Sequence, residues 1–545
     1  MNALPKGAES INYVKAAALK KELARWQELA LVDVREQGQY GEGHPFHAAP
    51  LPYSRLELDV GKLIPNFAVN IVLLDNGHGD TLGLRAACRL QAMGYQHVRV
   101  LKDGASGWRA AGYHLFKGVH VPSKTFGELV EAKCHTPRIS PEALRLMMER
   151  GDDVVVLDGR PRSEYAKMNI PGAVSCPNAE LPYRLHRLAP NKGTTVVVNC
   201  AGRTRSIIGA QSLINMGASH QVFALENGTQ GWYLKDYPLE RHSNRFYPQV
   251  SAADLPLKDI RQNAAALAQT CDVKTAHADQ LQRWRQDHSR TTYFFDIRTP
   301  EEFEAGSAHG ALHAEGGQLL QGTDLYIGVR HARVVLYDTD GIRAPVIGSW
   351  LSQMGYEAWL FQNAESLSAQ NVAVTSSQPV DFPLLAEVHL AELPELDGPV
   401  QIFDLRSSME FRAGHIRGAV WSTRSRIRLQ VDAQSEMHGR EDQPIILLAA
   451  NPRIASLAAG ELTTSQRQRS RFLMADAAVW MQHGVTIEST PNFPADSDCL
   501  DYLFFAHDRH EGNKVAAAQY LEWEMNLIYQ LDAQEKSSFR FFEMG

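Results

Sequence analysis

The sequence predicts an α/β protein made of four tandem domains, each a small parallel sheet covered by helices on both faces. The first observation behind this is a strand that recurs four times, an apolar segment ending in Asp-x-Arg at Asp33, Asp158, Asp296 and Asp404. These aspartates are separated by 125, 138 and 108 residues, and each interval suits one domain of ordinary size. The other two observations are a constant distance to a second strand and a Met-Gly pair after it.

The second strand ends at the same distance from the first in three of the repeats. The residue that follows it lies 42 positions after the repeat's aspartate, at Asp75, Cys200 and Asp338. In the fourth repeat the apolar residues 445–448 take this place. A helical stretch then ends at Met-Gly, where glycine is typical of a helix C-terminus; the pairs are Met93-Gly94, Met216-Gly217 and Met354-Gly355.

The repeats divide the chain into predicted domains at residues 1–119, 120–245, 246–375 and 376–492, followed by a helical extension at 493–545. In the extension, apolar residues recur every three or four positions, at Val515, Ala518, Leu521, Met525, Ile528 and Leu531. This pattern predicts an amphipathic helix. The helix lacks the basic face of a membrane-surface helix, so we expect it to dock on the rest of this chain.

Composition excludes several functional classes. A chain of 545 residues is too long for one core, and its formal net charge of −7 argues against a nucleic-acid partner. No apolar run approaches the roughly 18 residues that span a bilayer, so no membrane association is expected. The first 21 residues lack a signal-peptide core, which predicts a cytoplasmic protein. Six cysteines without C-x-x-C or zinc spacing suggest neither a disulfide framework nor a metal site.

The strongest candidate site is the turn that begins at Cys200. The apolar residues 195–198 before it predict a buried strand, and residues 207–214 after it predict a helix. Open α/β sheets place ligands at such a turn, where N–H groups and the helix dipole create positive potential. Arg203 and Arg205 would further stabilise a thiolate and hold an anionic substrate.

The residues from Cys200 to Ser206 resemble the active-site loop of the rhodaneses, which are thiosulfate and persulfide sulfurtransferases. Four further stretches of the second repeat are similar to that family, and they are Asp158-Gly159-Arg160, Glu164-Tyr165, Ile170-Pro171-Gly172-Ala173 and the pair Glu226-Asn227-Gly228 with Gly231-Trp232. The resemblance implies tandem rhodanese-like domains.

The resemblance also implies a reaction in which Cys200 takes up a sulfane sulfur and carries it as a persulfide. The donor would be thiosulfate or a related small molecule, and the acceptor a thiol or cyanide, with a sulfur-accepting protein as a further candidate partner. No metal or organic cofactor is implied. The loop residues expected to bind substrate are Ala201, Gly202, Arg203, Thr204, Arg205 and Ser206. The hydroxyls of Thr204 and Ser206 would either donate to the persulfide or cap the helix.

Asp158 and Arg160 are expected to brace the loop rather than to react, because the pair recurs in repeats without a loop cysteine. In those repeats the loop carries Asp75, Asp338 or the pair Ala449-Ala450, none of which is a thiol nucleophile. Acidic loops would also repel an anionic donor. We therefore expect the first, third and fourth repeats to be catalytically silent. The other cysteines, Cys88, Cys134, Cys176, Cys271 and Cys499, are expected to be inert.

Two alternatives to a sulfurtransferase remain at this point. One is a non-enzymatic scaffold or sulfur-relay protein, in which the silent repeats hold partners. The other is a cysteine phosphatase, although those enzymes have arginine six positions after the nucleophile, where this chain has Ser206. A departure from the two-domain thiosulfate enzymes is Glu164, which stands near the position of a substrate-contacting arginine. Arg162 is the residue expected to compensate for it.

Overall fold

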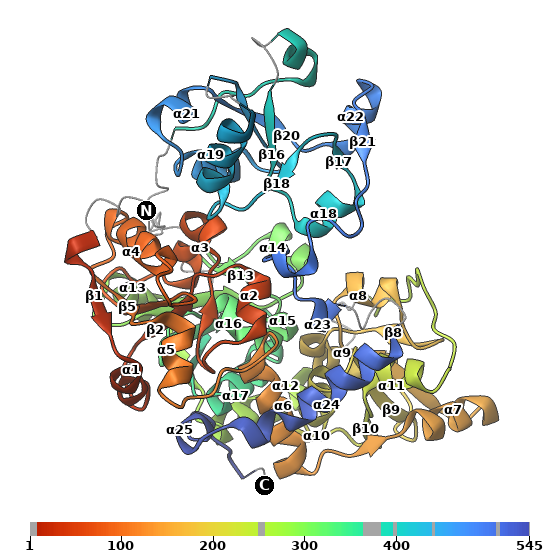
Figure 1. The fold of residues 1–545 in the computed structure, drawn as a ribbon. Helices are drawn as coiled ribbons and strands as arrows, with labels where there is room; N and C mark the ends of the chain where they lie inside the picture. Colours follow the sequence, from red (N-terminus) through yellow and green to blue (C-terminus); the bar gives the residue numbers. More distant parts are fainter. Residues whose placement is uncertain are drawn as a thin grey trace.

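The structure, a computed structural model, describes residues 8–248, 257–362, 383–395, 400–438, 442–507 and 513–543. Four parallel sheets follow one another along the chain, which confirms the predicted tandem α/β architecture (Figure 1). The predicted boundary between the third and fourth domains, at residues 375 and 376, lies outside the described residues.

The first three repeats share one strand order. If the five strands of a repeat are numbered along the sequence, their order across the sheet is 1-5-4-2-3, so the first and third strands form the two edges. In repeat 1 the order is β1 (Asn12–Val14), β5 (His97–Leu101), β4 (Asn70–Leu74), β2 (Ala30–Asp33) and β3 (Ala49–Pro50). In repeat 2 it is β6 (Arg138–Ile139), β10 (Val222–Leu225), β9 (Thr195–Asn199), β7 (Val154–Asp158) and β8 (Val174–Ser175). In repeat 3 it is β11 (Lys274–Ala276), β15 (Glu357–Phe361), β14 (Arg333–Tyr337), β12 (Thr292–Asp296) and β13 (Leu312–His313).

Helices connect these parallel strands. Repeat 1 has α1 (Ala16–Leu23), α2 (Gln37–Glu42), α3 (Leu56–Leu63), α4 (Leu82–Ala92) and α5 (Gly104–Ala110), and α6 (Val121–Cys134) leads to repeat 2. Repeat 2 has α7 (Pro141–Arg150), α8 (Arg162–Lys167), α9 (Leu181–Leu188), α10 (Thr204–Asn215) and α11 (Gly228–Leu234). Repeat 3 has α12 (Leu257–Thr270), α13 (Ala278–Gln286), α14 (Pro300–Ala305), α15 (Gly316–Gln321), α16 (Thr323–Tyr326) and α17 (Arg343–Gln353).

The fourth repeat keeps the central part of this plan. Its parallel sheet has the order β18 (Val420–Trp421), β16 (Gln401–Asp404), β19 (Ile445–Ala449) and β20 (Ser470–Met474), and β17 (His415–Ile416) pairs antiparallel with β21 (Ile487–Glu488). Its helices are α18 (Ser408–Ala413), α19 (Ile427–His438), α20 (Pro452–Ala459), α21 (Thr464–Gln468) and α22 (Ala477–Gln482).

Strand register explains the constant spacing in the sequence. Asp158 at the end of β7 pairs with Asn199, the residue before Cys200, and Asp33 and Asp296 pair with Leu74 and Tyr337 in the same way. In repeat 4 Asp404 pairs with Leu448. The loop position of Cys200 is therefore held by Asp75, Asp338 and Ala449 in the other repeats.

The Asp-x-Arg pairs make the same contacts in all four repeats. Each arginine bonds its own aspartate, and its NH2 group also donates to the carbonyl oxygen eight residues further on. The carbonyl acceptors of the four arginines, at distances of 2.8, 2.6, 2.6 and 2.8 Å, are those of Gly43, Met168, Gly306 and Gly414. Because the pair recurs unchanged in all four repeats, it serves the fold rather than one site.

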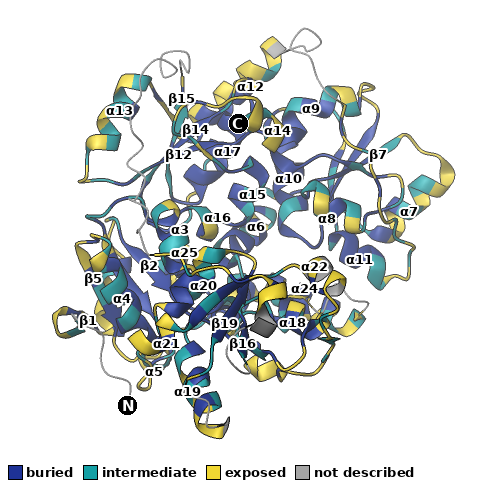
Figure 2. Cartoon of the chain, turned by 90° about the horizontal axis from the view of Figure 1, so that it is seen from above, coloured by how far each residue is buried: buried dark blue, intermediate teal, exposed yellow. Residues whose placement is uncertain are grey.

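Repeats 1, 2 and 3 share a single hydrophobic core. Alternate strand residues point to opposite faces of each sheet, and Leu73, Val198 and Leu336 from three different sheets belong to the same buried cluster. Their outer faces form separate clusters under other helices. Figure 2 shows the shared core as the dark region around α6, α10, α15 and α17. The common core holds the first three repeats in fixed positions around the site of Cys200.

Repeat 4 has its own two clusters and contacts repeat 1 through charged groups. Arg424, which is 2% exposed, bonds Glu57 of repeat 1 and Glu461 of its own repeat. Arg85 of repeat 1 reaches back to Glu461, at 2.5 Å. Arg424 is the member that both carboxylates share, so its removal would weaken the compensation of Glu57 and Glu461 together.

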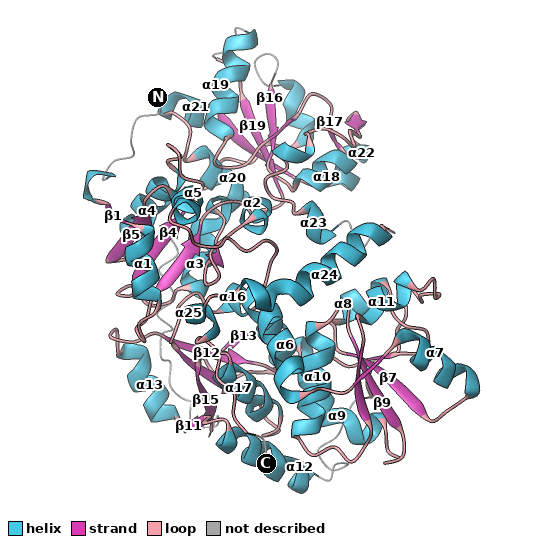
Figure 3. Cartoon of the chain, turned by 60° about the horizontal axis from the view of Figure 1, so that its bottom comes forward, coloured by secondary structure: helices cyan, strands magenta, loops and turns pink. Residues whose placement is uncertain are grey.

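The C-terminal extension docks on the chain as expected. It contains α23 (Phe504–His507), α24 (Lys514–Gln530) and α25 (Ala533–Lys536), and α24 packs on α6 and α11 (Figure 3). The apolar stripe was predicted incorrectly in part, since Val515 is 67% exposed while Tyr520 and Glu524 are buried. The buried face carries polar groups because it borders the cavity described below. Among the described residues, no helix combines the length and apolar character needed to cross a bilayer.

Candidate active site

Cys200 lies at the turn from β9 to α10, as the sequence predicts. The side chain is 2% exposed. Among the residues that the structure describes, none accepts a hydrogen bond from the backbone N–H groups of residues 201–206. A helix N-terminus leaves such donors unsatisfied, and here they belong to the loop that directly follows Cys200. The arrangement suits a negatively charged group next to the sulfur.

Neighbouring backbone holds the first half of the loop in place. The N–H groups of Thr229 and Gln230 at the start of α11 donate to the carbonyl oxygens of Cys200 and Ala201, at 2.8 and 3.0 Å. This close approach needs Gly228, whose φ is +53° and where a Cβ atom would lie 2.3 Å from the Cys200 oxygen. At the end of the sheet, Asn199 Nδ2 donates to Asp158 of the adjacent strand at 2.8 Å. Asp158, itself bonded by Arg160, thus contacts the residue before Cys200, and bracing of the loop by this pair remains a prediction.

The loop opens into a cavity of about 520 Å³, and four other parts of the chain add to the walls that repeat 2 provides. Gln37 belongs to repeat 1, and His120 and Lys124 belong to the segment that leads from repeat 1 to repeat 2. Repeat 3 contributes Gln318 and Gln321 from α15, and the extension contributes Leu503, Ala506, His507, Tyr520 and Glu524. Sequence reasoning missed these walls, because residues distant in sequence meet there only through interdomain packing.

Both loop arginines are engaged by carboxylates. Arg203 Nε donates to Glu128 of α6 at 2.7 Å, and its NH2 group also bonds Glu131. Arg205 forms two hydrogen bonds to Glu164, at 2.8 and 2.7 Å. Their expected role in holding the substrate anion remains a prediction, and the positive charge they offer is partly balanced. Arg162 does not compensate for Glu164, because it pairs with Glu301 of repeat 3 at 2.6 Å and does not line the cavity.

The two loop hydroxyls do not cap α10. Thr204 Oγ1 donates to Glu524 Oε1 at 2.8 Å, which ties the loop to the extension. Ser206 Oγ donates to the Arg203 carbonyl oxygen at 2.7 Å and lies 3.6 Å from Cys200 Sγ. The capping prediction is therefore wrong, because within the described part of the chain neither hydroxyl oxygen accepts a hydrogen bond from an N–H group of α10. Ser206 is the hydroxyl adjacent to the sulfur.

The remaining cysteines have environments unfavourable to a thiolate. Desolvation raises the pKa of each thiol, to about 12 for Cys271 and well above its ordinary value for Cys176. The same cause raises the pKa of Cys88, Cys134 and Cys499. None of the five lines the cavity. Within the described ranges, no group of three or more His, Cys, Asp and Glu side chains is placed to hold a metal ion.

The loops of the other repeats are filled by their own side chains. In repeat 3, Asp338 accepts hydrogen bonds from the N–H groups of Gly341 and Ala344, at 3.1 and 2.8 Å. In repeat 1, Asp75 accepts from Gly77 and Gly83, at 2.9 and 3.0 Å. Desolvation, with Asp80 and Asp340 nearby, raises the pKa of Asp75 to about 6 and that of Asp338 to about 7.

In repeat 4 the loop N–H group is bonded by an amide instead of a carboxylate, because Asn451 Oδ1 accepts a hydrogen bond from the N–H of Arg453 at 2.9 Å. In all three loops, a side-chain oxygen of the loop therefore accepts from one or two backbone N–H groups, whereas the N–H groups after Cys200 have no acceptor among the described residues.

The comparison with family models agrees with the repeats described above. The model of the rhodanese-like domain matches residues 15–111, 140–235, 277–365 and 389–482. The chain belongs to the rhodanese family. Within this family it is similar over its whole length to the crystal structure of a thiosulfate sulfurtransferase from Pseudomonas aeruginosa. The TM-score is 0.87 at 36% identity, covering 98% of this chain and 100% of that chain.

Shorter members of the rhodanese family match with low scores. The structure of SseA from Escherichia coli, described with 3-mercaptopyruvate sulfotransferases, has a TM-score of 0.17 at 15% identity, covering 40% of this chain and 98% of that chain. No curated protein sequence matches the chain significantly. The Pseudomonas aeruginosa structure covers all four rhodanese-like repeats, so the four-repeat arrangement with its extension also occurs in that solved protein.

Proposed function

We propose that this rhodanese-family chain is a sulfurtransferase that carries a sulfane sulfur as a persulfide on Cys200. The observation that carries the proposal is the position of Cys200, a cavity-lining thiol beside N–H groups without acceptors among the described residues. Such donors stabilise a charged sulfur and the anion that leaves it. The whole-length similarity to a thiosulfate sulfurtransferase supports the same reaction class.

The proposed reaction is a double displacement. The Cys200 thiolate attacks the outer sulfur of thiosulfate, the sulfur–sulfur bond breaks, and sulfite departs with the bonding electron pair. The resulting persulfide then gives its terminal sulfur to cyanide or to a thiolate, which restores the Cys200 thiolate. The atoms and charges balance without a metal or an organic cofactor.

The polar groups of the cavity suit an anionic donor. Among the described residues, its lining contains the cations Lys124, Arg160, Lys167, Arg203 and Arg205 and the carboxylates Glu164 and Glu524. The three arginines are paired with Asp158, Glu128, Glu131 and Glu164, so the N–H groups of the loop supply most of the attraction for an anion. Thiosulfate fits these donors, as does another small anionic sulfane donor.

The direct test of the proposal is the mass of the intact protein after incubation with thiosulfate. We expect a gain of one sulfur atom per chain, located by peptide mapping on the peptide that contains Cys200. Addition of cyanide should remove that sulfur and release thiocyanate. An unchanged mass with both thiosulfate and a small-molecule persulfide donor would contradict the proposal.

We expect Glu524→Gln to lower the KM for thiosulfate by about 3- to 10-fold. The carboxylate is 2% exposed on the cavity wall and lies 3.7 Å from Lys124 Nζ. Replacing it with an amide removes a negative charge that opposes the dianion, and each tenfold change corresponds to about 1.4 kcal/mol. Steady-state kinetics with thiosulfate measures the effect. Thr204→Val, which removes the hydrogen bond without changing the charge, is the matched control and should leave that KM nearly unchanged.

A further inference from the structure

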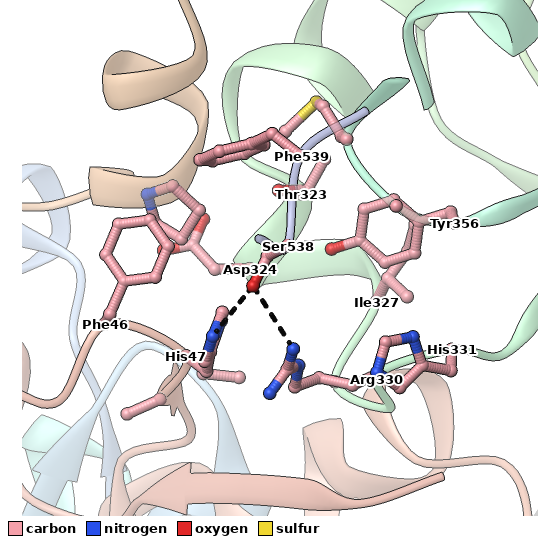
Figure 4. A pocket seen from close by; sticks show the side chains of 16 residues that line it. Phe46, His47, Thr323, Asp324, Ile327, Arg330, His331, Tyr356, Ser538 and Phe539 are labelled. Atoms are coloured by element: carbon pink, nitrogen blue, oxygen red, sulfur yellow. Dashed lines mark hydrogen bonds between the residues drawn. The ribbon is translucent and has the colours of Figure 1, made fainter. Parts of the chain in front are cut away.

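A second, smaller cavity lies between repeat 1, repeat 3 and the residues after α25. It has a volume of about 60 Å³ and shares no lining residue with the cavity of Cys200. Its polar lining consists of His47, Thr323, Asp324, Arg330, His331, Tyr356 and Ser538. Figure 4 shows Ser538 between His47 and Arg330, with its oxygen directed to both.

Arg330 is the charged group of this cavity that has no counter-ion among the residues that the structure describes. Within the described part of the chain, no carboxylate oxygen lies within 4.0 Å of its guanidinium nitrogens. Its hydrogen bonds go to the Leu23 carbonyl oxygen at 2.9 Å and to Ser538 Oγ at 3.4 Å, which are both neutral. Desolvation lowers the pKa of Arg330, but a guanidinium remains protonated at neutral pH.

Arg330 is partly buried, and two arginines that are fully buried are arranged differently. Arg343 contacts three carboxylates and Arg424 contacts two. Even partial removal of a cation from water is destabilising unless an anion compensates it. The contrast indicates that the partner of Arg330 is not supplied by the described side chains.

The groups around Arg330 are neutral hydrogen-bonding groups. His331 is 9% exposed and its buried Nδ1 has no hydrogen-bond partner among the described residues. His47 Nε2 lies 3.2 Å from Ser538 Oγ. Desolvation first, and then the charge of Arg330, lowers the pKa of both imidazoles, for His331 to about 4. Both rings are therefore neutral near pH 7, and each can donate one N–H.

Asp324, the carboxylate in the described lining, already has other partners. Asp324 accepts a hydrogen bond from Tyr40 at 3.3 Å and contacts His120 Nδ1 at 2.9 Å. Both partners come from outside repeat 3, so Asp324 is held toward repeat 1 and the segment that follows it. Its charge does not neutralise Arg330, because the two groups are more than 4.0 Å apart.

We propose that this cavity binds a small inorganic oxyanion of the size of sulfate, held by Arg330 with His331, His47 and Ser538. The cavity volume limits the size of the ligand. One water molecule needs about 10–15 Å³ of cavity volume, so about 60 Å³ accommodates a tetrahedral anion but no larger metabolite. A guanidinium matches the geometry of such an anion with two parallel hydrogen bonds. The bound anion would connect repeat 1, repeat 3 and the end of the extension. The inference does not depend on the proposed sulfur transfer.

The first test uses the wild-type protein and selenate, which has the shape of sulfate and scatters X-rays anomalously. Crystals grown without sulfate or phosphate are soaked in selenate. We expect an anomalous peak between the side chains of Arg330, His331 and Ser538. A well-resolved cavity without such a peak would overturn the proposal, whether or not selenate also binds beside Cys200.

The second test measures binding in solution by equilibrium dialysis with radiolabelled sulfate at constant ionic strength. We expect Arg330→Met to lose one saturable site per chain, whereas Arg283→Met retains it. Arg283 is the matched control because it lies in repeat 3, is exposed and pairs with Asp279 at 2.9 Å. Ser538→Ala, which removes a single hydroxyl, should keep the site but weaken its affinity several-fold. Equal stoichiometry in the wild-type protein and Arg330→Met would refute the assignment.

Discussion

Replacing Cys200 with serine should lower the rate of sulfur transfer from thiosulfate to cyanide by at least about 10³-fold. The hydroxyl of serine cannot form a persulfide, and loss of a covalent nucleophile removes the pathway rather than slowing one step. None of the other cysteines lines the cavity, and the pKa of every one of those thiols is raised by burial. Thiocyanate formation under saturating donor measures the effect.

Two cysteines provide controls for this experiment. Cys88 and Cys134 are partly exposed, so serine fits at either position without opening a large cavity. Cys88→Ser and Cys134→Ser should keep most of the wild-type rate. Substantial turnover by Cys200→Ser, with an unchanged circular dichroism spectrum, would exclude Cys200 as the sulfur carrier.

Arg343→Met should lower the free energy of unfolding by about 3–5 kcal/mol. Arg343 is 1% exposed and contacts Asp340 at 2.7 Å, Glu180 of repeat 2 at 2.8 Å and Glu302 at 2.6 Å. Methionine has a similar volume but leaves the buried carboxylate of Asp340 without its cation, whereas Glu180 keeps its contact with Arg184. Urea unfolding of the full chain measures the change, and Arg283→Met on the exposed surface of repeat 3 should change it by less than about 0.5 kcal/mol.

The pH dependence of stability provides a second measure of the same interaction. Desolvation opposes the shift, but the hydrogen bonds and charge of Arg343 hold the pKa of Glu302 at about 2, below its ordinary value of 4.5. A lowered folded-state pKa contributes stability above the unfolded-state pKa, and that contribution is lost as the pH falls from about 4.5 to 2. In Arg343→Met this part of the acid sensitivity should disappear. An Arg343→Met protein that keeps both wild-type stability and its acid profile would show that the pair contributes little.

Local sequence patterns predicted most of the fold. The Asp-x-Arg endings and the 42-residue spacing work because strand register repeats, so that Asp158 pairs with Asn199 and Asp296 with Tyr337. The place of Cys200 follows from that register. Tandem domains were therefore predictable from short segments, each of which contains its own strand, turn and helix signals.

The partners of the site residues were not predictable in this way. Arg203 bonds Glu128, which lies 75 positions earlier, and Thr204 bonds Glu524, which lies 320 positions later. No periodicity relates such pairs, since they arise from the packing of α6 and α24 against the loop. The same limit explains the error in the apolar stripe of α24, where Glu524 is buried because it faces a polar cavity.

In repeats 1, 3 and 4, a side chain of the loop occupies the N–H groups that would otherwise bind an anion. It acts as an inhibitor that is covalently attached to its own binding site. The carboxylates of Asp75 and Asp338 and the amide of Asn451 occupy their N–H donors from within the loop. A tethered ligand has a high effective concentration, so a free anion at ordinary concentrations cannot compete with it. One chain should therefore accept one sulfur atom at saturation. A thiol inserted near Asp338 would not make that loop active unless the carboxylate that occupies its N–H groups were removed as well.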